Sequence, residues 1–125
     1  MERKYLKLND VIAYKSAFHL ANYIWEIVIS WDNFSKFTVG EQLIRAVDSI
    51  SANIAEGFGR YHKKDKIKFY RYSFGSLKET FDWCAKAKIR HLLMNQQYDC
   101  VMQELQKLPR QINFLIAWTN NKLRE

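Results

Sequence analysis

Basic side chains are concentrated in one stretch of this 125-residue sequence, residues 60–91. The stretch contains ten lysines and arginines and three acidic residues, a net charge of +7, whereas the rest of the chain has ten of each kind. A localised positive charge attracts polyanions and is typical of proteins that contact phosphate groups. The residues that we expect to contact phosphates of RNA or DNA are Arg60, Lys63, Lys64, Lys68, Arg71 and Lys78.

Aromatic residues alternate with these basic ones. Tyr61, Phe69 and Tyr72 could stack on unpaired bases, although we expect phosphate contacts with little base reading. The same composition fits a solvated lysine-rich helix face, or a protein-interaction scaffold that docks an acidic partner without binding nucleic acid. For one protomer the sequence supports binding and a solvated face equally, whereas a ring of copies would combine their fields and favour binding.

A polar group lies at the end of the helix that we predict before this stretch, and it consists of Asn53, Glu56 and Arg60. Glu56 lies in the last helical turn, where the helix dipole disfavours a carboxylate by up to about 1 kcal/mol. A counter-charge is therefore needed, and Arg60 or a later basic residue could supply it. Because no nucleophile or metal ligand is near, we favour a structural latch between two helices over a binding site.

Residues that catalyse reactions or bind metals form no recognisable pattern. His19, His62 and His91 are widely spaced, and no H-E-x-x-H motif, phosphate-binding glycine loop or G-x-S-x-G motif occurs. Cys84 and Cys100 lack the spacing of a metal site or a secreted disulfide framework, so we expect buried free thiols. The sequence predicts a protein that is not an enzyme, with no metal and no cofactor.

Four helical segments must position these groups, at about residues 10–30, 38–57, 63–93 and 98–122. Apolar residues recur in each segment at the three- and four-residue spacing of a helix. The joints between segments are short, which favours antiparallel neighbours. We therefore predict an all-α fold, an antiparallel up-down-up-down four-helix bundle formed by a single domain, residues 1–125.

The second segment has its own start and stop signals. Thr38 followed by Glu41 predicts a capping box, and Gly57 predicts a helix end in the left-handed conformation that glycine adopts easily. Between them, one narrow apolar stripe predicts a central position in the core. Its members are Leu43, Val47, Ile50 and Ile54.

The third segment should be one helix with three different sides. On a helical wheel, one side carries the lysines and arginines, and a second, meant for the core, carries Ile67, Tyr70, Phe74, Leu77, Phe81, Cys84 and Ala85. Phe69, Tyr72 and Trp83 form a third side that points away from the core, and we predict an oligomer interface there. They could instead pack against a chain end or the joint at residues 31–37. Gly75 in mid-helix suggests a close backbone approach, since glycine costs about 1 kcal/mol relative to alanine.

The fourth segment contains Pro109, which removes a backbone donor and predicts a kink near residues 105–108, or a break into two helices. No apolar run is long enough to cross a membrane, and the start of the sequence lacks a signal-peptide core. We expect a cytoplasmic protein with no membrane partner.

The second segment also carries a family resemblance. Its most specific parts are Ser49-Ile50, residues 53–57 and Gly59-Arg60, and the resemblance continues in Phe69-Tyr70 and Gly75-Ser76. These residues resemble the signature of the four-helix-bundle proteins encoded in intervening sequences of bacterial 23S ribosomal RNA genes. Ile44 departs from that pattern, because a second basic residue is common there, and so does the joint before Glu41, which lacks a proline.

The resemblance implies a bacterial four-helix bundle that assembles into a homopentamer. The accessory protein of diversity-generating retroelements is similar, and it is a basic pentamer that binds nucleic acid and a reverse transcriptase. By analogy, the resemblance implies a homo-oligomer whose partner is RNA or DNA.

Overall fold

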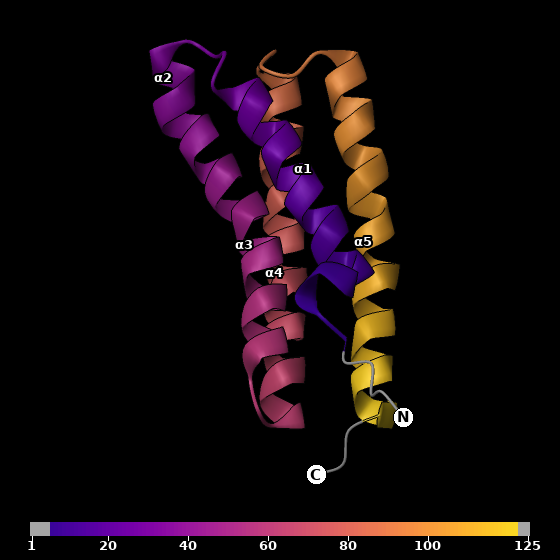
Figure 1. Cartoon of the computed structure of the whole chain (residues 1–125). Helices are drawn as coiled ribbons and strands as arrows, with labels where there is room; N and C mark the ends of the chain where they lie inside the picture. The colour runs from indigo at the N-terminus through magenta and orange to yellow at the C-terminus, as the bar shows by residue number, and fades with distance from the viewer. Residues whose placement is uncertain (1–5, 123–125) are drawn as a thin grey trace.

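The computed structural model describes residues 6–122, and every regular element in that range is helical (Figure 1). Four long helices pack so that each contacts two neighbours, in the order α1, α3, α4, α5 and back to α1. This arrangement confirms the predicted antiparallel four-helix architecture. The elements are η1 (Leu8–Asp10), α1 (Ile12–Val28), α2 (Asn33–Ser35), the π-helical turn η2 (Lys36–Gly40), α3 (Glu41–Gly59), α4 (Lys63–Ile89) and α5 (Asn95–Lys122).

The centre of the core is the predicted stripe of α3. All four of its members are completely buried. Small residues of α1, Ala13 and Ala17, let that helix approach closely, and Leu20 and Ile24 fill the space that remains. The stripe therefore positions α3, whose last turn leads into the basic stretch.

The start of this helical stretch differs from the prediction. Helical backbone begins at Asn33, where the Asp32 side chain accepts a hydrogen bond from the Ser35 amide at 3.2 Å. Thr38 forms no capping box, because its hydroxyl donates back to the Phe34 carbonyl at 2.7 Å. The capping box at Thr38 is therefore wrong: helical backbone already continues through η2 into α3.

Gly57 does not end α3, so the predicted left-handed stop is also wrong. The helix continues to Gly59, and none of the described glycines has a positive φ. Gly57 is buried instead, and a Cβ atom there would lie 2.7 Å from the Lys66 carbonyl oxygen and 2.8 Å from the Tyr70 ring. The glycine is needed because α3 and α4 approach each other closely at this point.

α4 is one continuous helix, as predicted, but its buried side is rotated from the predicted one. Ser73, Thr80 and Ala87 are buried, whereas Ala85 is exposed. The hydroxyls of Ser73 and Thr80 donate to the carbonyls of Tyr70 and Ser76. Their hydrogen bonds are satisfied within the helix, so a polar residue can face the core here at low cost.

α5 begins at Asn95 and runs through Pro109 as one continuous helix (Figure 1). The alternative of two shorter helices is therefore wrong. Of the two cysteines, Cys84 is buried as expected, but Cys100 is exposed. Within residues 6–122, no helix combines the length and hydropathy that a membrane span requires.

Candidate nucleic-acid interface

The outer side of α4 carries four exposed basic residues, which we call the basic face: Lys64, Lys68, Arg71 and Lys78. Their spacing of three, four and seven residues places them on one side of the helix, over about 21 Å of its length. None of them forms an ion pair with a described residue. In contrast, Arg45, Arg60, Lys86 and Lys107 each have a carboxylate within 3.2 Å. The charge of the basic face is thus uncompensated.

Gly75 lies in the middle of the basic face. A Cβ atom at this position would have no neighbour within 4 Å, so no part of the described protomer makes the close approach that we expected. Because glycine has no side chain, the helix surface between Arg71 and Lys78 is slightly recessed.

An aromatic cluster lies beside the basic face and consists of Arg60, Phe69 and Tyr72. The Arg60 guanidinium carbon is 4.6 Å from the centre of the Phe69 ring, and the Phe69 and Tyr72 rings meet edge to face at 5.4 Å. Lys68 Nζ approaches the same Phe69 ring at 5.5 Å. Such cation–π contacts keep positive charge next to aromatic surface. Tyr72 is 51% exposed.

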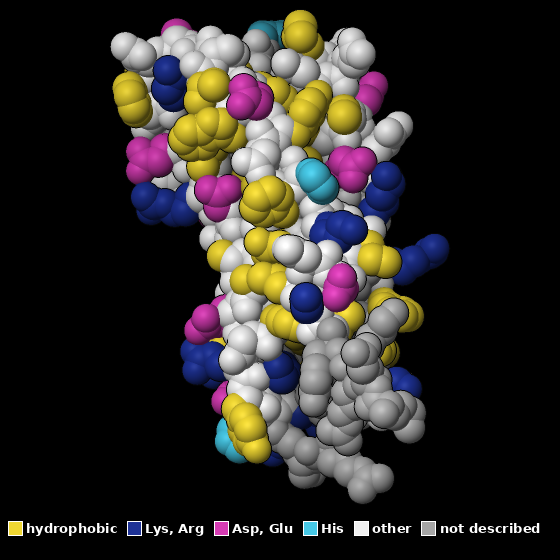
Figure 2. Space-filling view, viewed as in Figure 1, with side chains coloured by type: hydrophobic (Ala, Val, Ile, Leu, Met, Phe, Trp, Pro, Cys, Tyr) yellow, Lys and Arg dark blue, Asp and Glu magenta, His cyan; other side chains and the backbone are white. Residues whose placement is uncertain are grey.

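The turn between α3 and α4 carries Tyr61, which is 89% exposed. Its only ring contact among the described residues is with His62, edge to face at 5.1 Å. Figure 2 shows Lys and Arg side chains, a histidine and a hydrophobic side chain at this end of the molecule. The turn therefore presents an aromatic ring among positive charges.

The polar group of Asn53, Glu56 and Arg60 forms two separate sets of contacts. Glu56 Oε1 accepts a hydrogen bond from Arg60 at 2.7 Å, in an exposed ion pair that holds the guanidinium over Phe69. Arg60 does supply the counter-charge, but the pair lies at the surface. Asn53 is half-buried and connects α3 to α4, because its amide donates to the Ser49 carbonyl and reaches the Ser76 hydroxyl at 3.4 Å.

Two other lysines at the start of α4 are less accessible. Lys63 is half-buried. The Lys66 ammonium donates to the Phe58 carbonyl at 2.7 Å, and burial lowers its pKa. This bond satisfies a carbonyl at the end of α3 that has no partner within the helix. We did not predict from the sequence that Lys66 caps the end of α3. The only indication in the sequence is that Lys66 lies a few residues after that helix end.

The three aromatics predicted to form an oligomer interface lie in different surroundings. Tyr72 is exposed and Phe69 is half-buried in the aromatic cluster, whereas Trp83 packs against the core. Trp83 also lines a hollow together with Phe34 and Phe37. These two residues belong to the joint at residues 31–37, against which we had considered that the aromatics could pack.

A larger apolar surface lies on α1. Phe18, Trp25 and Ile29, which we call the α1 face, are each 44–50% exposed. Trp25 and Ile29 continue into a groove against α3 that also includes Phe37 and Ile44. Hydrophobic side chains are visible in Figure 2 where α1 lies and near α2.

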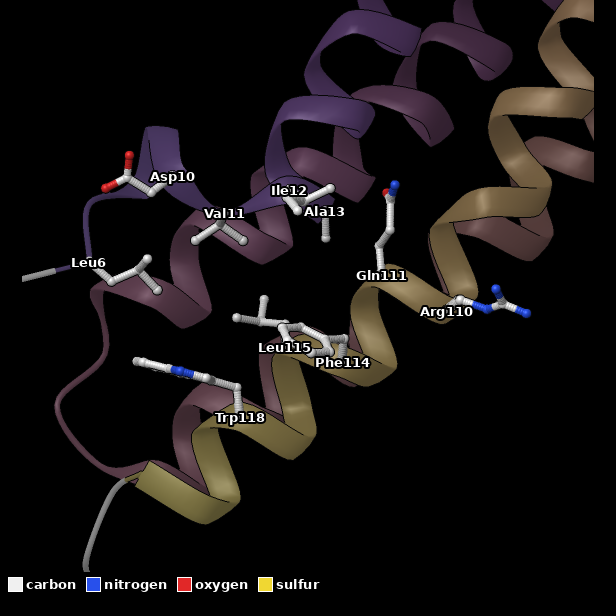
Figure 3. A pocket seen from close by; sticks show the side chains of 10 residues that line it. All are labelled: Leu6, Asp10, Val11, Ile12, Ala13, Arg110, Gln111, Phe114, Leu115 and Trp118. Atoms are coloured by element: carbon white, nitrogen blue, oxygen red, sulfur yellow. The ribbon is translucent and has the colours of Figure 1, made fainter.

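A separate cavity of about 410 Å³ lies between the N-terminal segment and α5 (Figure 3). Its walls are mostly apolar and include Leu6, Ile12, Phe114 and Trp118. Gln111 contributes a buried side-chain oxygen that has no hydrogen-bond partner among residues 6–122. The cavity could hold an apolar group, but nothing in its lining resembles a nucleophile with a base. Across residues 6–122, no cluster of histidine, cysteine and acidic residues could hold a metal ion.

Comparisons with known proteins agree with this architecture. A crystal structure of a protein of unknown function from the S23 ribosomal protein family of Bacteroides thetaiotaomicron is similar, with a TM-score of 0.78 and 20% sequence identity over 90% of this chain and 99% of that chain. A comparison with curated proteins gives no match. The family model described as 23S rRNA-intervening sequence protein matches residues 9–114. The chain therefore belongs to the family of 23S rRNA-intervening sequence proteins.

Proposed function

We propose that this protein is a non-enzymatic, homo-oligomeric helical bundle of the cytoplasm that binds RNA or DNA through phosphate contacts. The observation that carries the proposal is the basic face, whose four cations are exposed, lie on one side of one helix and have no carboxylate partner among the described residues. Such cations can contact phosphates without first breaking an ion pair within the protein. Arg60 lies beside the basic face and is oriented by Glu56 and Phe69, but its charge is already paired with the Glu56 carboxylate.

The number of phosphate contacts sets the expected dependence on salt. If the four residues of the basic face each neutralise one phosphate, the slope of log affinity against log salt is about −3.6 for duplex DNA. Affinity would then fall about 150-fold between 50 and 200 mM salt. A larger assembly that presents several basic faces to one nucleic acid would have a steeper slope.

The α1 face supports the oligomeric part of the proposal. Half-exposed aromatic and aliphatic side chains that continue into an apolar groove are typical of surfaces that bind protein. A homopentamer is the assembly that the family resemblance implies. Light scattering coupled to gel filtration should give five times the protomer mass of 15.0 kDa, and a mass of one protomer would remove the oligomeric part alone.

Charge reversal tests nucleic-acid binding. We expect the variant Lys64→Glu/Lys68→Glu/Arg71→Glu to lose binding to RNA and DNA at least 100-fold in fluorescence anisotropy at 50 mM salt, with unchanged helicity by circular dichroism. The matched control, Lys15→Glu/Arg110→Glu/Lys122→Glu, changes the net charge equally at exposed positions outside the basic stretch, so it should bind nearly as well as wild type.

Two outcomes would contradict the proposal. The first is a wild-type protein that ignores RNA and DNA even at low salt, and the second is an equal loss of binding in both triple variants. Binding to an acidic polypeptide with none to nucleic acid would instead support the interaction scaffold.

A further inference from the structure

We propose that the α3–α4 turn and the aromatic cluster select single-stranded nucleic acid, with one unpaired base stacked on Tyr61 and another on Tyr72. This inference rests on the proposed nucleic-acid binding and goes beyond it, because phosphate contacts alone do not distinguish single strands from duplexes. The ligand is defined by its chemistry: a flexible polyanion with uncovered base faces.

Tyr61 carries the first part of the argument. The residue is 89% exposed and is not part of the core. The turn and the first turn of α4 place three basic residues next to it in the sequence, Arg60, Lys63 and Lys64, against one acidic residue, Asp65. A base that stacks on this ring therefore places its own phosphates near cations. Aromatic rings among positive charges form the usual platform for unpaired bases.

Tyr72 carries the second part. Its ring and the Phe69 ring are nearly perpendicular, and 51% of the residue remains exposed beside Lys68. Phe69 is fixed in turn by Arg60, which is held by Glu56. Tyr72 is thus in contact with a fixed neighbour and still half exposed, so its ring is available to a base. Its position on α4 is three residues from Gly75, where the helix surface is shallow.

The geometry gives a direction for the strand. From Tyr61 at the turn, the basic face extends along α4 past Tyr72 and Gly75 to Lys78. A single strand can follow this line and turn its bases towards the two tyrosines. A duplex cannot stack on them, because its base faces are covered by neighbouring base pairs. The tyrosines therefore add affinity only for unpaired bases.

The test compares one 20-nucleotide sequence as single-stranded RNA, single-stranded DNA and duplex DNA, measured by fluorescence anisotropy at fixed salt. We expect both single strands to bind at least ten-fold more tightly than the duplex. Tyr61→Ala and Tyr72→Ala should each weaken single-strand binding about five- to 100-fold and leave duplex binding and the salt slope unchanged. Tyr61→Phe keeps the stacking ring and should bind as wild type does.

Phe34→Ala is the matched control. Phe34 is 78% exposed, but it lies beside Asp32 and outside the basic stretch, so its removal should not change binding. Equal affinity for single strands and duplex would overturn the inference while leaving the proposed function in place. An equal effect of Tyr61→Ala on duplex and single strands would also overturn it. Absence of any nucleic-acid binding would overturn the proposed function itself.

Discussion

The two sides of α4 share one backbone but follow different physical rules. The inner side buries Tyr70, Leu77 and Cys84 almost completely, and it lies so close to α3 that only a glycine fits at residue 57. The outer side exposes the basic face and leaves open space around Gly75. Shape therefore constrains the inner side, whereas charge defines the outer side.

The two sides of α4 should therefore tolerate different substitutions. A close-packed interior responds to a single added methyl group, whereas a solvated surface accepts changes of size but responds to changes of charge. The same substitution, glycine to alanine, should therefore have opposite effects on the two sides. Three measurements test this contrast.

The largest effect should come from Gly57→Ala. The added Cβ would collide with the Lys66 carbonyl oxygen and the Tyr70 ring, both of which belong to the neighbouring helix. Overpacking of this kind lowers the free energy of unfolding by about 1–3 kcal/mol. We expect a value near the upper end, because the backbone carbonyl of Lys66 cannot move aside as a flexible side chain can. Urea unfolding followed by circular dichroism measures the loss of stability. A variant as stable as wild type would show that the helices separate easily and that the inner side is not constrained by shape.

The next effect concerns pH. Burial raises the pKa of the Cys84 thiol from its ordinary 9.0 to about 12, and burial also raises the pKa of Tyr70 to about 12, against the opposing effect of a side-chain hydrogen bond with Thr119. Because the unfolded chain loses these protons first, their contribution to stability is complete below pH 9. It then falls by up to about 1.4 kcal/mol per pH unit for each group as the pH rises towards 12.

Unfolding experiments between pH 8 and 10 can isolate the cysteine. In this range the Cys84→Ala variant should show a flatter dependence of unfolding free energy on pH than wild type, because tyrosine in the unfolded chain ionises only near pH 10. Equal slopes for the two proteins would mean that the thiol is accessible to water in the folded state.

The smallest effect should come from Gly75→Ala on the outer side. With no atom within 4 Å of the new Cβ, the variant gains the helix propensity of alanine, and we expect it to be about 1 kcal/mol more stable than wild type. The urea experiment used for Gly57→Ala measures the change. A loss of stability that depends on protein concentration would instead reveal another copy packed on Gly75.

Much of the architecture could be predicted from residue spacing. The stripe from Leu43 to Ile54 is strictly periodic and is buried as expected, and the excess of positive charge is visible in composition alone. The helix ends were harder, because Thr38 and Gly57 carry real local signals that tertiary packing overrides. Rules for helix ends consider only residues close in the sequence, whereas Gly57 is constrained by Tyr70, which belongs to another helix.

The candidate site was predictable in its charges but not in its arrangement. A helical wheel centred on hydrophobic residues misplaces the buried side of α4, because it treats Ser73 and Thr80 as polar although their hydroxyls are satisfied internally. It also placed Trp83 with Tyr72, whereas the structure packs Trp83 on the core and leaves Tyr72 in the aromatic cluster. The sequence indicated the ion pair between Glu56 and Arg60, but no pattern in it indicates that Phe69 lies against the Arg60 guanidinium.

The bond from Lys66 to the Phe58 carbonyl has a consequence for how the α3–α4 turn works. Together with the contacts of Arg60, it holds the turn in place from both helices, so we expect the connection to be rigid. A ligand that arrives there has little chain entropy to remove, since the loop is already ordered. The freedom lost on association would then be almost entirely that of the ligand.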